Sequence, residues 1–113
     1  MISLPVLVLE QVINSLTTET MRGTRKWEQY LYSERGIFTK NEAGTIFWIG
    51  SRADCYHVRV YSSFGEMRDN VARSIGIVPR NSRLYTKLGE LYKLGIATAG
   101  DGGEALQSLL KII

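Results

Sequence analysis

Three short segments in the middle of the chain constrain its fold more than any other feature. Residues 37–39, 45–51 and 56–62 are rich in Ile, Phe, Trp, Tyr, Val and Thr, the residue types that favour β-strands. Turn-forming residues at 41–44 and 51–54 separate these segments. Because the connections are so short, the simplest arrangement is an antiparallel meander.

The last of these segments predicts two different faces for the sheet. Successive side chains of a strand point to opposite faces. Tyr56, Val58 and Val60 therefore share one face, which we expect to be buried. His57, Arg59 and Tyr61 share the other face, which we expect to be wet and basic.

Helical periodicity surrounds the meander. Apolar residues recur at helical spacing in four segments, which are residues 3–16, 24–34, 64–75 and 101–113. Ser63 and Glu66 form a capping box in front of the third segment, and Asp101 and Glu104 repeat the pattern in the fourth. The chain is therefore expected to form a single α+β domain over residues 1–113. We expect an antiparallel sheet of three to five strands, with helices packed on one face and with N- and C-terminal helices.

Residues 81–99 are compatible with two structures. As a helix, they carry Leu84, Leu88 and Leu91 on one side. As a hairpin, strands at 83–88 and 91–98 meet at Gly89 and Glu90, a two-residue turn with glycine in its first position. A glycine inside a helix costs about 1 kcal/mol relative to alanine. No capping box opens the segment either, so we favour the hairpin and keep the helix as the alternative.

Composition excludes several classes of protein. The 113 residues contain one cysteine and one histidine, which excludes an internal disulfide framework and a Cys/His zinc site. The longest apolar run near the N-terminus, residues 2–9, is too short to cross a bilayer. We expect a cytoplasmic protein with no membrane association, no metal and no other cofactor.

The positive charge is concentrated in one part of the chain. The formal net charge is +3, but residues 68–93 hold six basic residues and only Asp69 and Glu90 as acidic ones. Basic side chains neutralise phosphates, and arginine also recognises guanine. We therefore expect a nucleic-acid-binding protein, with double-stranded DNA favoured over RNA. The expected contact residues are Arg59, Arg80, Arg83, Tyr85, Lys87 and Lys93.

With the hairpin, the order of elements resembles the half-domain of the LAGLIDADG homing endonucleases over most of the chain. The similarity lies in the Ser-Ser-Phe-Gly-Glu sequence at 62–66 and in the 92–99 strand, which leads through Gly-Asp-Gly-Gly into a final amphipathic helix. The resemblance implies a curved antiparallel sheet that sits on DNA, and two copies that pair as a homodimer. No run of residues matches the acidic motif of the family, so the expected half-domain is catalytically degenerate.

With the helix, residues 64–106 resemble a winged helix-turn-helix. The similar features are the apolar positions at 71–77, the leucines at 84, 88 and 91, and the Leu-Gly-Ile sequence at 94–96. The resemblance implies a recognition helix, on which Arg83 and Lys87 lie one turn apart and opposite the leucines. Residues 96–106 would then form the wing.

Two further functions are open alternatives. A metal-dependent nuclease needs two or three converging acids, for which Glu34, Glu42 and Asp54 are the candidates near the sheet, with Glu34 and Glu42 favoured. A protein-interaction module would involve no nucleic acid at all.

Overall fold

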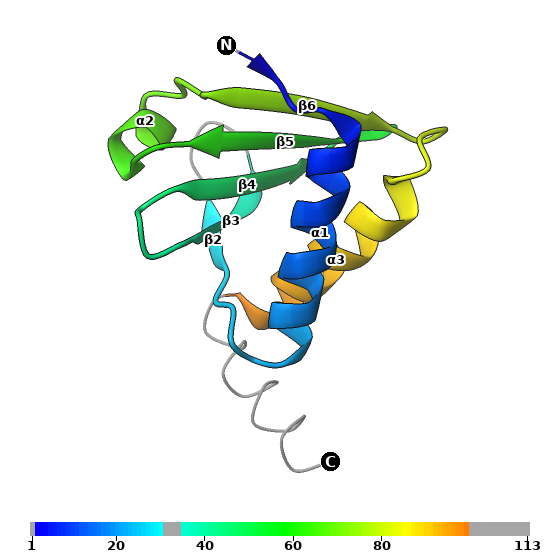
Figure 1. The fold of residues 1–113 in the computed structure, drawn as a ribbon, viewed down its shortest axis with the longest axis horizontal. Helices are drawn as coiled ribbons and strands as arrows, with labels where there is room; N and C mark the ends of the chain where they lie inside the picture. The colour runs from blue at the N-terminus through cyan, green and yellow to red at the C-terminus, as the bar shows by residue number, and fades with distance from the viewer. Residues whose placement is uncertain (1, 31–34, 100–113) are drawn as a thin grey trace.

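The computed structural model describes residues 2–30 and 35–99. Within these two ranges the chain forms one sheet and three helices (Figure 1). In chain order the elements are β1 (Ile2–Ser3), α1 (Val6–Met21), β2 (Glu28–Tyr30), β3 (Gly36–Lys40), β4 (Ile46–Ser51), β5 (Cys55–Tyr61), α2 (Phe64–Arg68), β6 (Ser74–Pro79) and α3 (Tyr85–Thr98).

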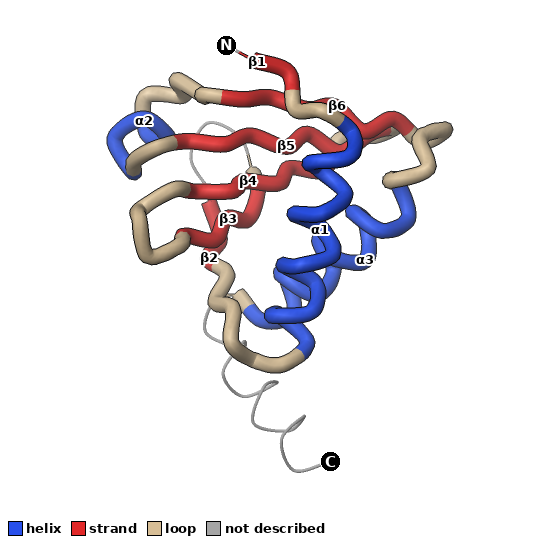
Figure 2. The backbone as a smooth tube through the Cα atoms, in the orientation of Figure 1, coloured by secondary structure: helices blue, strands red, loops and turns tan. Residues whose placement is uncertain are grey.

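The strands lie in the order β1-β6-β5-β4-β3-β2. Strands β2 to β6 form an open antiparallel sheet, and the two-residue β1 is added in parallel at the β6 edge. Helices α1 and α3 lie side by side over one face of this sheet (Figure 2). The predicted α+β class, the antiparallel sheet and the meander of β3, β4 and β5 are confirmed.

The main core lies between this face and the two helices. Helix α1 contributes Leu9, Ile13 and Leu16, as its apolar spacing predicts. The helix continues beyond the predicted end at residue 16, through a polar stretch in which the Thr20 hydroxyl donates to the Leu16 carbonyl at 2.7 Å. The same hydroxyl accepts a hydrogen bond of 2.8 Å from Trp27 Nε1, so this polar group is satisfied inside the core.

The opposite face of the sheet carries a second apolar cluster. Val58 faces the helices and is fully buried, as predicted, but Tyr61 on the other face is also only 2% exposed. The second cluster consists of Tyr30, Phe38, Ile46, Trp48, Tyr61 and Met67. The expectation of a wet second face is therefore wrong at Tyr61. Met67 is brought there by α2, whose position the local sequence does not specify.

The prediction of a helix over residues 64–75 is correct only in its first turn. The capping box is present, since Ser63 Oγ accepts from the Glu66 N–H at 3.2 Å. Hydrogen bonds from the Ser62 N–H and from Arg73 to the carboxylate lower the pKa of Glu66 to about 2. Helix α2 nevertheless ends at Arg68, and Asn70 follows with a φ of 56°. Beyond it the chain forms β6, because pairing with β5 outweighs the helical spacing of the apolar residues.

The prediction of a helix over residues 24–34 is wrong at 28–30, which form β2. Trp27 and Tyr30 are spaced like neighbours on a helix, but they belong to the clusters on opposite faces of the sheet. This is the arrangement that an extended chain imposes on residues three apart. Glu28 to Tyr30 pair with β3, so the hydrogen bonds of the sheet edge decide the local structure.

Residues 85–98 form a helix, so the favoured hairpin is wrong and the alternative is right. Leu88 and Leu91 are fully buried in the main core. The glycine that argued against the helix has a packing role. A Cβ atom at Gly89 would lie 3.1 Å from the Tyr56 hydroxyl oxygen of β5. The hairpin strands on which the resemblance to the LAGLIDADG half-domain depends are thus one helix.

Two other sequence expectations concern the same resemblances. Of the apolar positions at 71–77 on which the winged helix-turn-helix resemblance depends, those at 75–77 lie in strand β6. The predicted C-terminal helix at 101–113 lies outside the described residues, and the last helix of the described chain is α3.

Candidate nucleic-acid interface

Arg83 and Lys87 lie together at the start of α3. Arg83 precedes the helix and Lys87 is in its first turn, where its side chain is exposed while Leu88 and Leu91 are buried. Both side chains are about half exposed, at 59% for Arg83 and 48% for Lys87. The structure therefore brings these two predicted contact residues onto one surface. This is the arrangement expected for the helical alternative.

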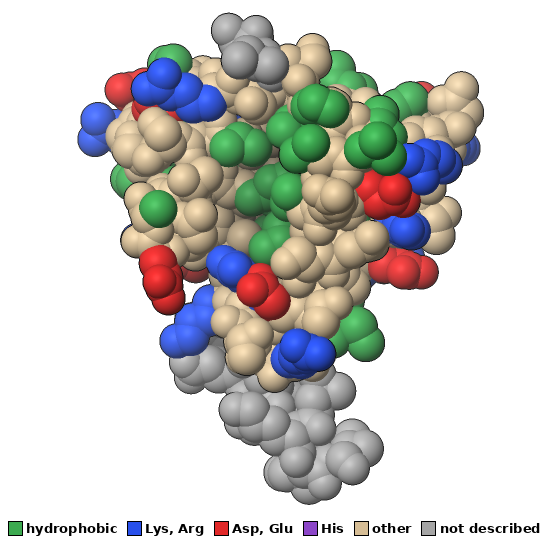
Figure 3. Space-filling model, in the orientation of Figure 1, with side chains coloured by type: hydrophobic (Ala, Val, Ile, Leu, Met, Phe, Trp, Pro, Cys, Tyr) green, Lys and Arg blue, Asp and Glu red, His purple; other side chains and the backbone are tan. Residues whose placement is uncertain are grey.

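Both cations bind the same acidic residue of α1. Arg83 Nη1 lies 3.1 Å from Oε1 and 3.0 Å from Oε2 of Glu10. Lys87 Nζ lies 3.1 Å from Oε2 of the same carboxylate. The hydrogen bond from Lys87 and the charges of the two cations lower the pKa of Glu10. Basic and acidic side chains alternate along this side of the molecule (Figure 3).

Three other predicted contact residues, Arg80, Tyr85 and Lys93, each have different surroundings. Arg80 is exposed in the loop before α3, and its Nη2 is 3.8 Å from Oδ1 of Asp54. Lys93 is exposed further along α3. Tyr85 points inward instead, with its ring centroid 5.1 Å from that of Tyr56 on β5. The Tyr85 ring therefore packs between α3 and the sheet.

Arg59 lies on the opposite face of the sheet from α3. Its guanidinium carbon is 4.5 Å from the centroid of the Trp48 ring, a cation–π contact. Arg59 Nη1 also donates to Asn70 Oδ1 at 3.3 Å, and the Tyr61 hydroxyl donates to the same oxygen at 2.9 Å. The structure does not bring Arg59 together with the cations of α3. The six predicted residues therefore do not form one continuous surface.

The nuclease candidates have no shared site in the described part of the chain. Glu42 is exposed in the turn between β3 and β4, and Glu34 lies outside the described residues. Within residues 2–30 and 35–99, no three His, Cys, Asp or Glu side chains are grouped so that they could hold a metal ion. In the same ranges, no helix is both long and apolar enough to cross a membrane.

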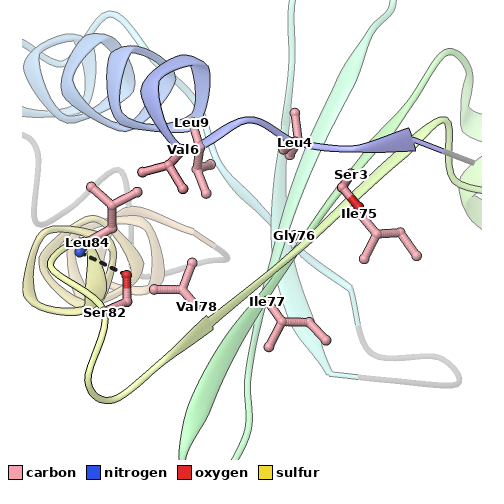
Figure 4. A pocket seen from close by; sticks show the side chains of 10 residues that line it. All are labelled: Ser3, Leu4, Val6, Leu9, Ile75, Gly76, Ile77, Val78, Ser82 and Leu84. Carbon is pink, nitrogen blue, oxygen red and sulfur yellow. Dashed lines mark hydrogen bonds between the residues drawn. The ribbon is translucent and has the colours of Figure 1, made fainter.

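An apolar hollow of about 510 Å³ lies next to the start of α3 (Figure 4). It is bounded by the first turns of α1, by the outer edge of β6 and by the loop that leads to Leu84. Strand β1 pairs with the outer edge of β6 only at Ser74 and Ile75. Among the described residues, no strand pairs with this outer edge from Gly76 onward. Helix α1 also exposes Val6, Leu7 and Val8 here, with Leu7 69% exposed. We call this surface, Val6 to Val8 with the hollow, the apolar corner.

No family model, curated protein or solved structure matches this chain. Glu10 binds both cations but could not be found from the sequence, because it is 73 residues from Arg83 along the chain.

Proposed function

We propose that the protein binds double-stranded DNA through the exposed side of α3. The observation that carries this proposal is a pair of exposed cations, Arg83 just before α3 and Lys87 in its first turn, at the start of a helix whose leucines are buried in the core. A helix of this kind fits the major groove, which is about 12 Å wide. Arg80 and Lys93 are exposed before and after this pair along the chain. Arg59 and Tyr85 are not part of this surface.

Phosphate contacts dominate such binding and make it sensitive to salt, whatever the DNA sequence. The Arg83→Ala/Lys87→Ala variant is expected to bind a duplex of random sequence roughly tenfold more weakly at low salt. Fluorescence anisotropy with a labelled duplex measures this effect, and single-stranded DNA and duplex RNA of the same sequence test the preference for duplex DNA.

The matched control is Arg22→Ala/Arg68→Ala, which removes the same charge from exposed arginines elsewhere. It is expected to keep its affinity within about twofold. Equal losses in the two double variants would mean that only net charge matters. An unchanged affinity in the Arg83/Lys87 variant would exclude α3 as the binding surface.

A second candidate function, a protein-interaction module, is favoured by the apolar corner. Exposed groups of aliphatic side chains commonly mark sites of protein association. Neither residues 2–9 nor residues 74–79 contain a charged side chain. A second copy of this chain is the partner that we test, because two molecules of net charge +3 approach most easily where neither carries charge.

If two copies meet at the apolar corner, Leu7→Ser is expected to raise the dissociation constant of the dimer by about tenfold or more. Analytical ultracentrifugation over a range of concentrations measures this constant. Met21→Ser is the control, because Met21 is equally exposed, at 69%, at the other end of α1. A monomer at every concentration, or equal effects of the two substitutions, would contradict this function.

A further inference from the structure

The two cations of α3 converge on a single oxygen atom. Oε2 of Glu10 accepts from Arg83 Nη1 at 3.0 Å and from Lys87 Nζ at 3.1 Å. These short distances mean that both side chains can reach one point at the same time. A backbone phosphate of DNA resembles a carboxylate in that it shares one negative charge between two oxygens, and both cations bind either group well.

We propose that Arg83 and Lys87 bind one and the same phosphate of the DNA backbone, and that the Glu10 carboxylate holds both cations in the free protein. The proposal rests on the function proposed above. It specifies in addition that the two cations together neutralise a single phosphate. It also gives Glu10 a role, because its carboxylate competes with that phosphate for the two cations. Binding then requires the two cations to exchange the carboxylate for the phosphate.

The burial of the three side chains supports this exchange. The Glu10 side chain is only 20% exposed, whereas the two cations are about half exposed. Arg83 and Lys87 have long side chains that are about half exposed, so rotation about their side-chain bonds can turn each cation outward. Arg83 engages Glu10 through Nη1. Its guanidinium has five N–H donors in all, so after it turns outward it can bind two phosphate oxygens at once.

A single shared phosphate has a measurable consequence for the salt dependence. The logarithm of the binding constant falls with the logarithm of salt concentration by about 0.9 for each phosphate neutralised. Arg83→Ala/Lys87→Ala should therefore flatten this slope by about 0.9, whereas two independent phosphates would give about twice that change. The two single substitutions should also be clearly non-additive, because each weakens the same contact.

Glu10→Gln provides the second test, because it removes the competing charge and keeps the size of the side chain. We expect this variant to bind duplex DNA about fivefold more tightly at low salt. The control is Glu42→Gln, which makes the same change of charge in an exposed turn. It is expected to change the affinity by less than about twofold. Circular dichroism melts confirm that each variant is folded at the temperature of the titration.

The experiment titrates the full chain and its variants with a labelled duplex between about 50 and 200 mM salt. Non-additive single substitutions, a slope change near 0.9 in the double variant and tighter binding by Glu10→Gln support the proposal. A slope change of about 1.8, additive single effects, or equal affinities of Glu10→Gln and Glu42→Gln would overturn it and leave DNA binding in place. If the unmodified protein binds no duplex at low salt, both this inference and the proposed function are wrong.

Discussion

Trp48→Ala is expected to lower the free energy of unfolding by about 3–5 kcal/mol. Trp48 is 2% exposed and lies in the second apolar cluster, on the sheet face opposite α1 and α3. Its ring occupies the space above two glycines. A Cβ atom at Gly36 would come within 2.6 Å of the indole, and one at Gly50 would overlap it. Removing the ring leaves a cavity that the backbone cannot fill, and Arg59 loses its cation–π partner.

Urea denaturation of the purified variants measures this loss. Phe64→Ala is the matched control, because Phe64 is another large aromatic side chain but is 56% exposed on α2. Its substitution is expected to cost less than about 1 kcal/mol. If the two variants unfolded at the same urea concentration, the second cluster would contribute no more than an exposed side chain does.

The sequence predicted those parts of the fold that depend on local alternation. Strands β3 to β5 alternate their side chains between the two faces within one segment, so residues 37–62 are enough to identify them. The apolar spacing of α1 is equally local. The predicted helix over 64–75 includes α2 and the first two residues of β6, because Met67, Val71 and Ile75 have helical spacing. Pairing of β6 with β5 decides the outcome, and that pairing is a property of the assembled sheet.

Gly89 shows why residues 81–99 could not be assigned from the sequence. Both a type II′ turn and a close helix–sheet contact favour glycine, so the residue type alone does not distinguish them. The distinction depends on Tyr56, a residue of β5 that lies against Gly89. Gly95 of the same helix also makes a close contact with a residue distant in sequence, because a Cβ atom there would lie 3.2 Å from the Trp27 ring.

The candidate site was predicted in part. Arg83 and Lys87 could be paired from their spacing once a helix was assumed. Arg59 could not be separated from them, because that requires knowing which face of the sheet α3 covers. Glu10 had no signal at all in the sequence. It becomes part of the site only because α1 and α3 pack side by side, and this packing follows from the leucine side of α3.

Leu88→Ala tests that packing and is expected to lower the free energy of unfolding by about 2–5 kcal/mol. Leu88 is fully buried in the main core, together with Leu84 and Leu91. Ile96→Ala is the control, since Ile96 belongs to the same helix but is 42% exposed. The control should cost about 1 kcal/mol or less.

Urea denaturation compares the two α3 variants, and DNA titration below their unfolding transitions adds a second readout. Leu88 faces the sheet while Arg83 and Lys87 face solvent, so the folded Leu88→Ala variant should bind DNA within about twofold of the unmodified protein. Equal stabilities of the Leu88→Ala and Ile96→Ala variants would mean that α3 does not bury its leucines. A loss of DNA affinity in folded Leu88→Ala would mean that binding depends on the core of α3 as well as on its exposed cations.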